Sequence, residues 1–245
     1  MLLFYHIGKY ILLLKDVFSR VDNPRILLRR FFYEMNVIGI QSLGIIILIS
    51  AFMGMVLTIE IAFQLVAPWI PLTVVGSIVS DTSMLELSPT VTALVLAGRV
   101  GSNISAEIGN MKISEQIDAL EVMGINSASY IILPKILASL ISIPLLIILS
   151  IALSLLGGLY AGHALNIVST SDYIEGAQVT FRTFTLVYAI IKAFTFAFII
   201  SSVSSYQGYI VTGGSVEVSK ASTKAVVNSC IFILIFDYLL AVLLL

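Results

Sequence analysis

The stretch that decides the fold is residues 86–134, ELSPTVTALVLAGRVGSNISAEIGNMKISEQIDALEVMGINSASYIILP. Its first part, residues 90–108, is apolar enough to cross or nearly cross a bilayer, yet Arg99, Asn103 and Glu107 recur on one helical face. A charge costs roughly 2.5–3.5 kcal/mol at the centre of a membrane. We therefore expect this face to pack against protein.

A second stripe on the same segment consists of small residues. Its members are Gly98, Gly101, Ser102, Ser105 and Gly109. Small residues allow two helix backbones to approach closely in lipid, where no hydrophobic drive brings helices together. We interpret both stripes as helix-packing surfaces, and a direct functional role is the alternative.

The composition assigns the chain to the membrane. Hydrophobic residues make up 59% of it, charged residues 11%, and the mean hydropathy is +1.07, values that a soluble core cannot accommodate. A net charge of -1 without a basic run argues against nucleic acid as a partner. Cys230 is the only cysteine, and His6 and His163 are far apart, so no metal site is predicted.

Hydropathy predicts an all-α integral membrane protein with about five spanning helices. The predicted spans are residues 37–61, 90–108, 131–156, 186–203 and 225–245. Residues 1–20 are expected to form an amphipathic helix on the membrane surface, followed by a break at residues 22–24 and a basic helix entering the bilayer. Residues 72–87 are expected to form an outer turn and half-helix, and residues 157–162 to extend the third span.

Lysine and arginine fix the expected orientation. Ten of them fall on one side of the predicted spans, whereas the loops at residues 64–88 and 163–180 contain none. By the positive-inside rule the N-terminus is predicted to be cytoplasmic and the C-terminus to lie outside.

The loop after the second span is predicted to contain a short cytoplasmic helix near residues 114–124, with Ser114 as N-cap and Gly124 as stop. At about nine residues, roughly 13 Å, it is too short to span. An acidic side and an apolar side suit docking into a groove on another protein. The acidic residues are Glu115, Asp118 and Glu121, and the apolar ones are Ile117, Leu120 and Met123. A solvated connecting helix is the alternative.

Polar residues at membrane depth are the candidate substrate contacts. Glu60 and Gln64 lie one turn apart at the outer end of the first span, Glu86 precedes Pro89, and Lys192 falls within the fourth span. Alternatively, Lys192 snorkels or forms an ion pair with Asp237 or Glu60, and Glu86 caps a helix that begins at Pro89.

The stretch AGRVGSNISAEIGNMKISEQIDALEVMGINSASYIILPKILA resembles the signature of the MlaE (YrbE) permeases, the membrane subunits of ABC systems that move phospholipids between bacterial membranes with MCE-domain proteins. The likeness extends over the chain, through GMVLTIE in the first span and SVEVSKASTKAVVNS near the C-terminus. At residues 85 and 88, where many members have Arg and Gly, this chain has Leu85 and Ser88.

The resemblance implies a single permease domain over residues 1–245, with an interfacial or elbow region at 1–36 and a transmembrane region at 37–245. It also implies a homodimer in the bacterial inner membrane, with an ABC ATPase subunit on residues 115–123 as coupling helix and a periplasmic MCE-domain protein. By the same resemblance a phospholipid pocket lies near Gln64, Leu85, Glu86 and Lys192. ATP and Mg²⁺ are then bound by the ATPase, and no cofactor by this chain.

Physical requirements agree with that interpretation. Exposing two acyl chains of about 16 carbons to water would cost on the order of 25 kcal/mol, so a lipid route must keep the tails dry. No nucleotide site is found, because the nearest approach to a P-loop, residues 208–215, lacks the lysine. The alternatives are an intramembrane lipid enzyme, using Glu86, Arg99, Glu107 and His163, and a non-transporting scaffold or receptor.

Overall fold

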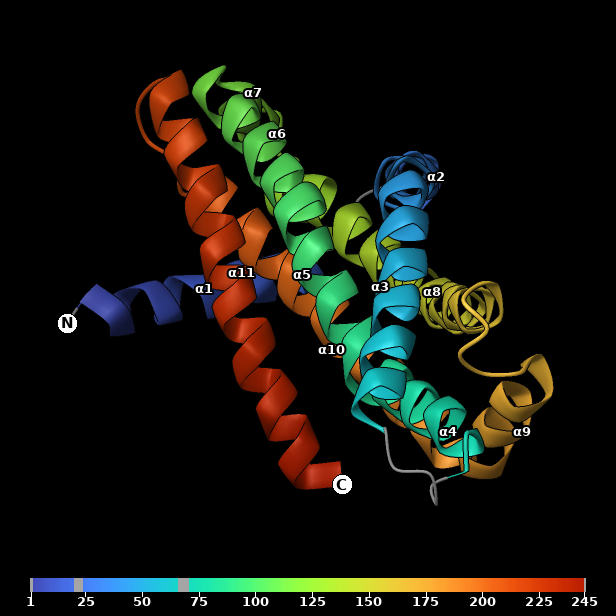
Figure 1. Cartoon of the computed structure of the whole chain (residues 1–245). Helices are drawn as coiled ribbons and strands as arrows, with labels where there is room; N and C mark the ends of the chain where they lie inside the picture. Colours follow the sequence, from blue (N-terminus) through green and yellow to red (C-terminus); the bar gives the residue numbers. More distant parts are fainter. Residues whose placement is uncertain (1, 20–23, 66–70, 245) are drawn as a thin grey trace. The chain divides into compact units, whose positions relative to one another are not determined.

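A computed structural model describes residues 2–19, 24–65 and 71–244. Within these ranges the chain is helical and has no strand (Figure 1). The first helices are α1 (Leu2–Ser19), α2 (Pro24–Ile38), the 3₁₀ turn η1 (Ile40–Ser42) and α3 (Leu43–Gln64). The helix expected over residues 1–20 is thus confirmed as a helix, while Asp22 and Asn23 of the expected break lie outside the described residues.

A long helical run of changing type follows. It consists of α4 (Thr73–Thr82), the π-helix η2 (Ser83–Val91), α5 (Thr92–Leu96), the π-helix η3 (Ala97–Gly101) and α6 (Ser102–Ile113). The expected helix over residues 72–87 is present as α4 and the first part of η2, but it does not end there, and the alternative in which a new helix begins at Pro89 is wrong. Pro89 lies inside η2, because a π-bulge absorbs a residue that cannot donate to the α-helical ladder.

The remaining helices are α7 (Gln116–Val122), α8 (Ser127–Ala164), α9 (Thr170–Thr180), α10 (Thr183–Tyr209) and α11 (Ser215–Leu244). α8 includes residues 157–162, as expected. α9 is a helix where the sequence predicts a loop over residues 163–180. Ser169 caps it by accepting a hydrogen bond from the backbone N–H of Asp172.

Four segments of the described chain are long and apolar enough to cross a membrane, in agreement with a multi-pass membrane protein. They are Pro24–Gln64, Ser127–Ala164, Thr183–Tyr209 and Ser215–Leu244. The fifth predicted span, residues 90–108, is helical but is divided among η2, α5, η3 and α6. No single one of those four elements is long enough to span.

The helices form two compact units, and α5, α8, α10 and α11 contribute to both. Unit 1 comprises Met1–Gln41, Leu94–Ile143 and Thr195–Tyr238, and unit 2 comprises Ser42–Ala93, Pro144–Phe194 and Leu239–Leu245. In unit 1, α1 is tied to α10 because Tyr10 donates to Ser202 Oγ at 2.8 Å and His6 hydrogen-bonds Tyr206 at 2.8 Å. Polar contacts of this kind hold helices together in lipid.

Unit 2 contains the closest helix packing. α4 and α9 lie side by side (Figure 1). A Cβ on Gly76 or Gly176 would collide with the backbone carbonyl of Tyr173 or Thr73, respectively. α3 and α8 pack through Gly54 and Gly157 in the same way. Glycine at these positions lets the backbones touch, which supplies the van der Waals attraction that holds helices together in lipid.

Candidate functional site

An ion pair between Lys192 and Glu86 is the central feature of unit 2. Lys192 on α10 is fully buried, and its Nζ donates to Glu86 Oε1 at 2.8 Å and to the carbonyl of Leu85 at 3.1 Å. The same ammonium lies 4.7 Å from the centre of the Tyr188 ring, within the range of a cation–π contact. The Glu86 side chain keeps 44% of its surface exposed. The pair thus presents a carboxylate at the surface and holds its counter-charge inside.

The local sequence explains why a peptide carbonyl is available to Lys192. Pro89 has no N–H, so the α-helical bond from residue 89 to the carbonyl of Leu85 cannot form. Lys192 donates to that carbonyl. An ion pair for Lys192 was among the expectations, but Glu86 was not among the partners considered.

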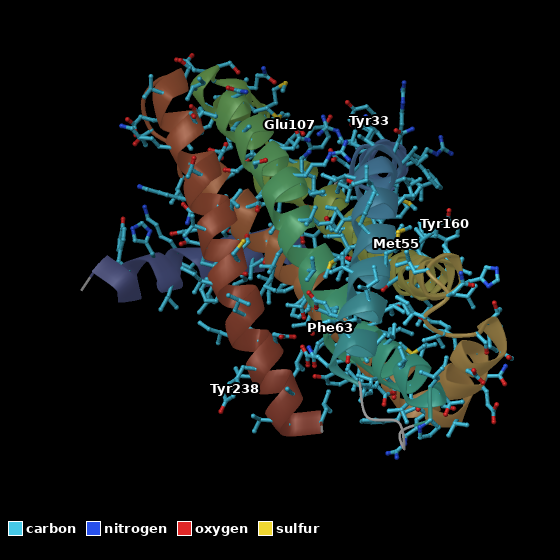
Figure 2. The ribbon with its side chains drawn as sticks, in the orientation of Figure 1. Tyr33, Met55, Phe63, Glu107, Tyr160 and Tyr238 are labelled. Atoms are coloured by element: carbon cyan, nitrogen blue, oxygen red, sulfur yellow. The ribbon has the colours of Figure 1, made fainter. Side chains whose placement is uncertain are left out.

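Three of the five predicted pocket residues therefore meet in space: Leu85, Glu86 and Lys192. The other two, Glu60 and Gln64, are exposed on the last turns of α3. Phe63, between them in sequence, is 80% exposed (Figure 2). Glu60 and Gln64 belong to the same unit as the pair.

Hydroxyl groups missed by the sequence analysis connect the helices of unit 2. Ser50 on α3 and Thr92 on α5 both donate to Ser150 on α8, at 2.8 and 2.9 Å. Ser83 on η2 donates to Ser154 on α8 at 2.8 Å. Because α8 carries serine at residues 150 and 154, one turn apart, spacing alone could have indicated a polar stripe on this helix.

The predicted coupling helix is present but shorter than expected. α7 has seven residues, and its N-cap position is held by Glu115 in the left-handed conformation, with φ 59°. Ser114 is therefore not the N-cap. Its hydroxyl donates to the carbonyl of Asn110 and closes α6 instead. Gly124, with φ 76°, ends the helix as predicted, because glycine adopts this conformation without strain.

The acidic side of α7 is partly engaged inside unit 1. Lys112 donates to Asp118 at 2.6 Å, and that hydrogen bond raises the pKa of Lys112 above its ordinary value. Glu121 accepts hydrogen bonds from Ser127 at 2.9 Å and from Tyr209 at 3.2 Å. Glu115 is exposed, so it is the acidic residue most available to a partner.

The apolar side of α7 also differs from the prediction. Ile117 is completely buried in unit 1, so it anchors the helix and is not available for docking. Leu120 is half-buried, and Met123 is 65% exposed. Val122 was not among the predicted contacts, yet it is 90% exposed. The exposed apolar surface is therefore formed by Val122 and Met123.

Two of the three glycines of the predicted packing stripe lie against a neighbouring helix within unit 1. A Cβ on Gly101 would lie 2.8 Å from Ser204 Oγ, and one on Gly109 would lie 3.1 Å from Val218 Cγ1, whereas Gly98 has no such neighbour within 4 Å. Ser102 donates back to the carbonyl of Arg99 at 3.1 Å. Arg99 is half-buried and Asn103 is exposed.

Glu107 on α6 (Figure 2) belongs to a charge cluster that is not predicted from the sequence. Lys135 on α8 is 2% exposed and donates to Glu107 at 2.7 Å and to Glu34 on α2 at 2.6 Å. Arg30 lies over the ring of Tyr130, 3.9 Å from its centre. One buried ammonium therefore joins three helices of unit 1.

Similarity to a known family extends over most of the chain. The family model described as Permease MlaE matches residues 31–243. The chain belongs to the MlaE permease family. The match covers both units and includes the Lys192–Glu86 pair, the Lys135 cluster and α7.

Individual relatives agree with this assignment. The intermembrane phospholipid transport system permease protein MlaE of Haemophilus influenzae is 35% identical over 208 residues, 84% of this chain and 79% of that protein. A protein of Synechocystis sp. named as a probable ABC transporter permease is 31% identical over 92% of this chain and 86% of its own length. The chloroplastic protein Trigalactosyldiacylglycerol 1 of Arabidopsis thaliana is 32% identical over 92% of this chain and 64% of its own. The first two names describe transporter subunits rather than enzymes.

Proposed function

We propose that this MlaE-family permease moves phospholipids between the inner membrane and a periplasmic MCE-domain protein, as a homodimer driven by a separate ABC ATPase. The observation that carries the proposal is the Lys192–Glu86 pair, a buried cation joined to a half-exposed carboxylate in an apolar chain. A zwitterionic headgroup offers one charge of each sign. It can exchange with such a pair without leaving either protein charge uncompensated.

The polar groups around the pair give each part of a headgroup a partner. Glu86, at the surface, attracts the amine, and Lys192 attracts the phosphate once Glu86 has turned toward the amine. Glu60 and Gln64 on α3 add polar groups in the same unit, and Leu85 adds an apolar contact in place of the arginine found in many family members. The acyl chains remain in contact with apolar side chains throughout.

Energy must come from a partner, because this sequence contains no P-loop. We assign ATP and Mg²⁺ to the ATPase and its docking site to α7, with Val122, Met123 and Glu115 as the exposed contacts. Asp118 and Glu121 hold the helix in place through Lys112 and Ser127. A partner groove that accepts two apolar side chains beside one carboxylate fits this surface.

Lipid content tests the site. We expect Glu86→Gln and Lys192→Met each to lower the phospholipid that co-purifies with the folded protein, as measured by mass spectrometry. Crosslinking from photoreactive residues at Gln64 and Leu85 should label phospholipid. Unchanged lipid content in both variants, without crosslinks from either position, would place the substrate elsewhere.

Docking has a separate test. Val122→Lys should reduce co-purification of the ATPase without lowering the stability of the permease, because this side chain is 90% exposed. The matched control is Val179→Lys on α9, where the native side chain is 79% exposed. Normal ATPase association in Val122→Lys, or equal loss in both variants, would contradict the docking assignment.

A further inference from the structure

Unit 2 contains a second apolar site that is separate from the Lys192–Glu86 pair. It is a cavity of about 270 Å³ between η2, α8 and α9. Met84, Leu155, Leu159, Tyr173 and Phe181 contribute to its walls, and Ser80 on α4 lines it as well. None of the pocket residues considered above lines it.

Water is a poor occupant for this cavity. A stable buried water needs two to four polar partners, and most of the lining side chains are apolar. The Tyr173 hydroxyl donates to the carbonyl of Leu155 at 3.2 Å. The lining therefore suits part of an acyl chain better than water.

The apolar lining alone would not select an occupant, because lipid tails are as apolar as the leucine side chains around the cavity. A positive charge next to the cavity residue Phe181 can select an occupant. Residues 62–89 and 157–185 together contain one Lys or Arg, Arg182, which follows the cavity residue Phe181. Burial raises the pKa of the Asp81 carboxyl, next to Ser80, and Arg182 lies near enough to oppose that rise.

We propose that this cavity is an accessory lipid site, which takes the part of one acyl chain nearest the headgroup while Arg182 binds the phosphate of the same phospholipid. A guanidinium binds phosphate oxygens through paired hydrogen bonds. Asp81 is close to the phosphate in this arrangement, so the site favours headgroups that also bring an amine or a hydroxyl over a bare phosphate monoester.

α9 both packs tightly against α4 and forms part of the cavity wall, so a lipid bound in the cavity contacts a helix that is itself held by its neighbour. Gly76 and Gly176 let the two helices touch, and α9 also supplies Tyr173 to the cavity wall. A chain bound there fills the space between α9 and α8. Occupancy therefore stabilises the position of α9 and of the Phe181–Arg182 turn that leads into α10, the helix of Lys192.

The test uses the full-length protein in vesicles of phosphatidylethanolamine and phosphatidylglycerol that contain a trace of phosphatidylglycerol with a photoreactive group in the half of one acyl chain nearest the headgroup. Peptide mapping should place label on Met84, Tyr173 or Phe181. Ala177→Phe, which fills the cavity, should lower this label several-fold, and Val179→Phe on the exposed side of the same helix should not.

Arg182→Gln tests the headgroup contact separately. It should lower the label from phosphatidylglycerol about fivefold, the effect of one surface cation on an anionic lipid, and leave the label from a matched diacylglycerol unchanged. Glu86→Gln should leave the cavity label unchanged, so failure of this site and failure of the Lys192–Glu86 site are distinguishable. Label that persists in Ala177→Phe, or that is equal for phosphatidylglycerol and diacylglycerol in the native protein, would overturn the proposal.

Discussion

Lys192 and Glu86 form an asymmetric ion pair, in which the ammonium is fully buried and the carboxylate, 2.8 Å away, keeps 44% of its side-chain surface exposed. Removing either partner therefore leaves a different charge in a different environment. The loss of the carboxylate leaves an ammonium in the interior, whereas the loss of the lysine leaves a carboxylate at the surface.

We expect the two single variants of this pair to differ in thermal stability. Glu86→Gln should destabilise the protein by roughly 1–3 kcal/mol, because a buried cation loses its counter-charge. Lys192→Met should cost less, and the double variant should recover much of the loss. Thermal denaturation of the detergent-purified proteins measures the order, and a larger loss in Lys192→Met than in Glu86→Gln would contradict it.

Pro89→Ala should regularise η2. An alanine supplies the N–H that can bond the carbonyl of Leu85, and it removes a residue that costs about 3 kcal/mol in a helix interior. We expect higher thermal stability together with less co-purified phospholipid, because the carbonyl is drawn away from Lys192. Pro134→Ala in α8 is the control, and its lipid content should not change. If Pro89→Ala retains its full lipid content, the carbonyl of Leu85 is not part of the lipid site.

Gly101→Leu and Gly98→Leu should differ although the two glycines lie on the same segment. A side chain at residue 101 meets Ser204, which is fully buried, whereas a Cβ on Gly98 would meet no neighbouring helix or side chain within 4 Å. Overpacking costs typically about 1–3 kcal/mol. The thermal stability of the protomer should therefore be lowered by Gly101→Leu only, and equal losses would show that the open face of Gly98 is also packed.

Tyr173 should make the protein sensitive to alkali. Burial raises the pKa of its phenol to about 12 from the ordinary 10.0. A raised pKa in the folded state means that the stability is complete below pH 10 and is lost as the pH rises toward 12, because only the unfolded chain ionises readily there. Phenolate absorbance and thermal midpoints should show this decline. Tyr173→Phe should reduce the loss of stability at alkaline pH. If the loss is unchanged in this variant, groups other than Tyr173 cause it.

Much of the architecture follows from composition and periodicity. Long apolar runs predict α8, α10 and α11, since a backbone in lipid must satisfy its hydrogen bonds within each helix. Gly124 at the end of α7 is readable because glycine alone adopts its conformation at no cost. The family likeness in residues 97–134 is confirmed by the match over residues 31–243.

Two local sequence signals, one at Ser114 and one at Pro89, led to wrong predictions of where a helix begins. Ser114 is a good N-cap by type, but its hydroxyl closes α6 and leaves Glu115 to begin α7. Proline usually ends or starts a helix, but here the run continues through Pro89 as a π-helix, and Lys192 on α10 donates to the carbonyl of Leu85. Short-range propensity is weak against such tertiary contacts.

The sequence by itself determined that this chain is a helical membrane protein, which residues are charged at membrane depth, and to which family it belongs. Only the tertiary structure decided that Lys192 pairs with Glu86, 106 residues away, and that Lys135 joins Glu34 and Glu107. The reason is physical: the cost of a buried charge makes a partner necessary, but any carboxylate within reach can meet that need. Which carboxylate is within reach depends on how the helices pack.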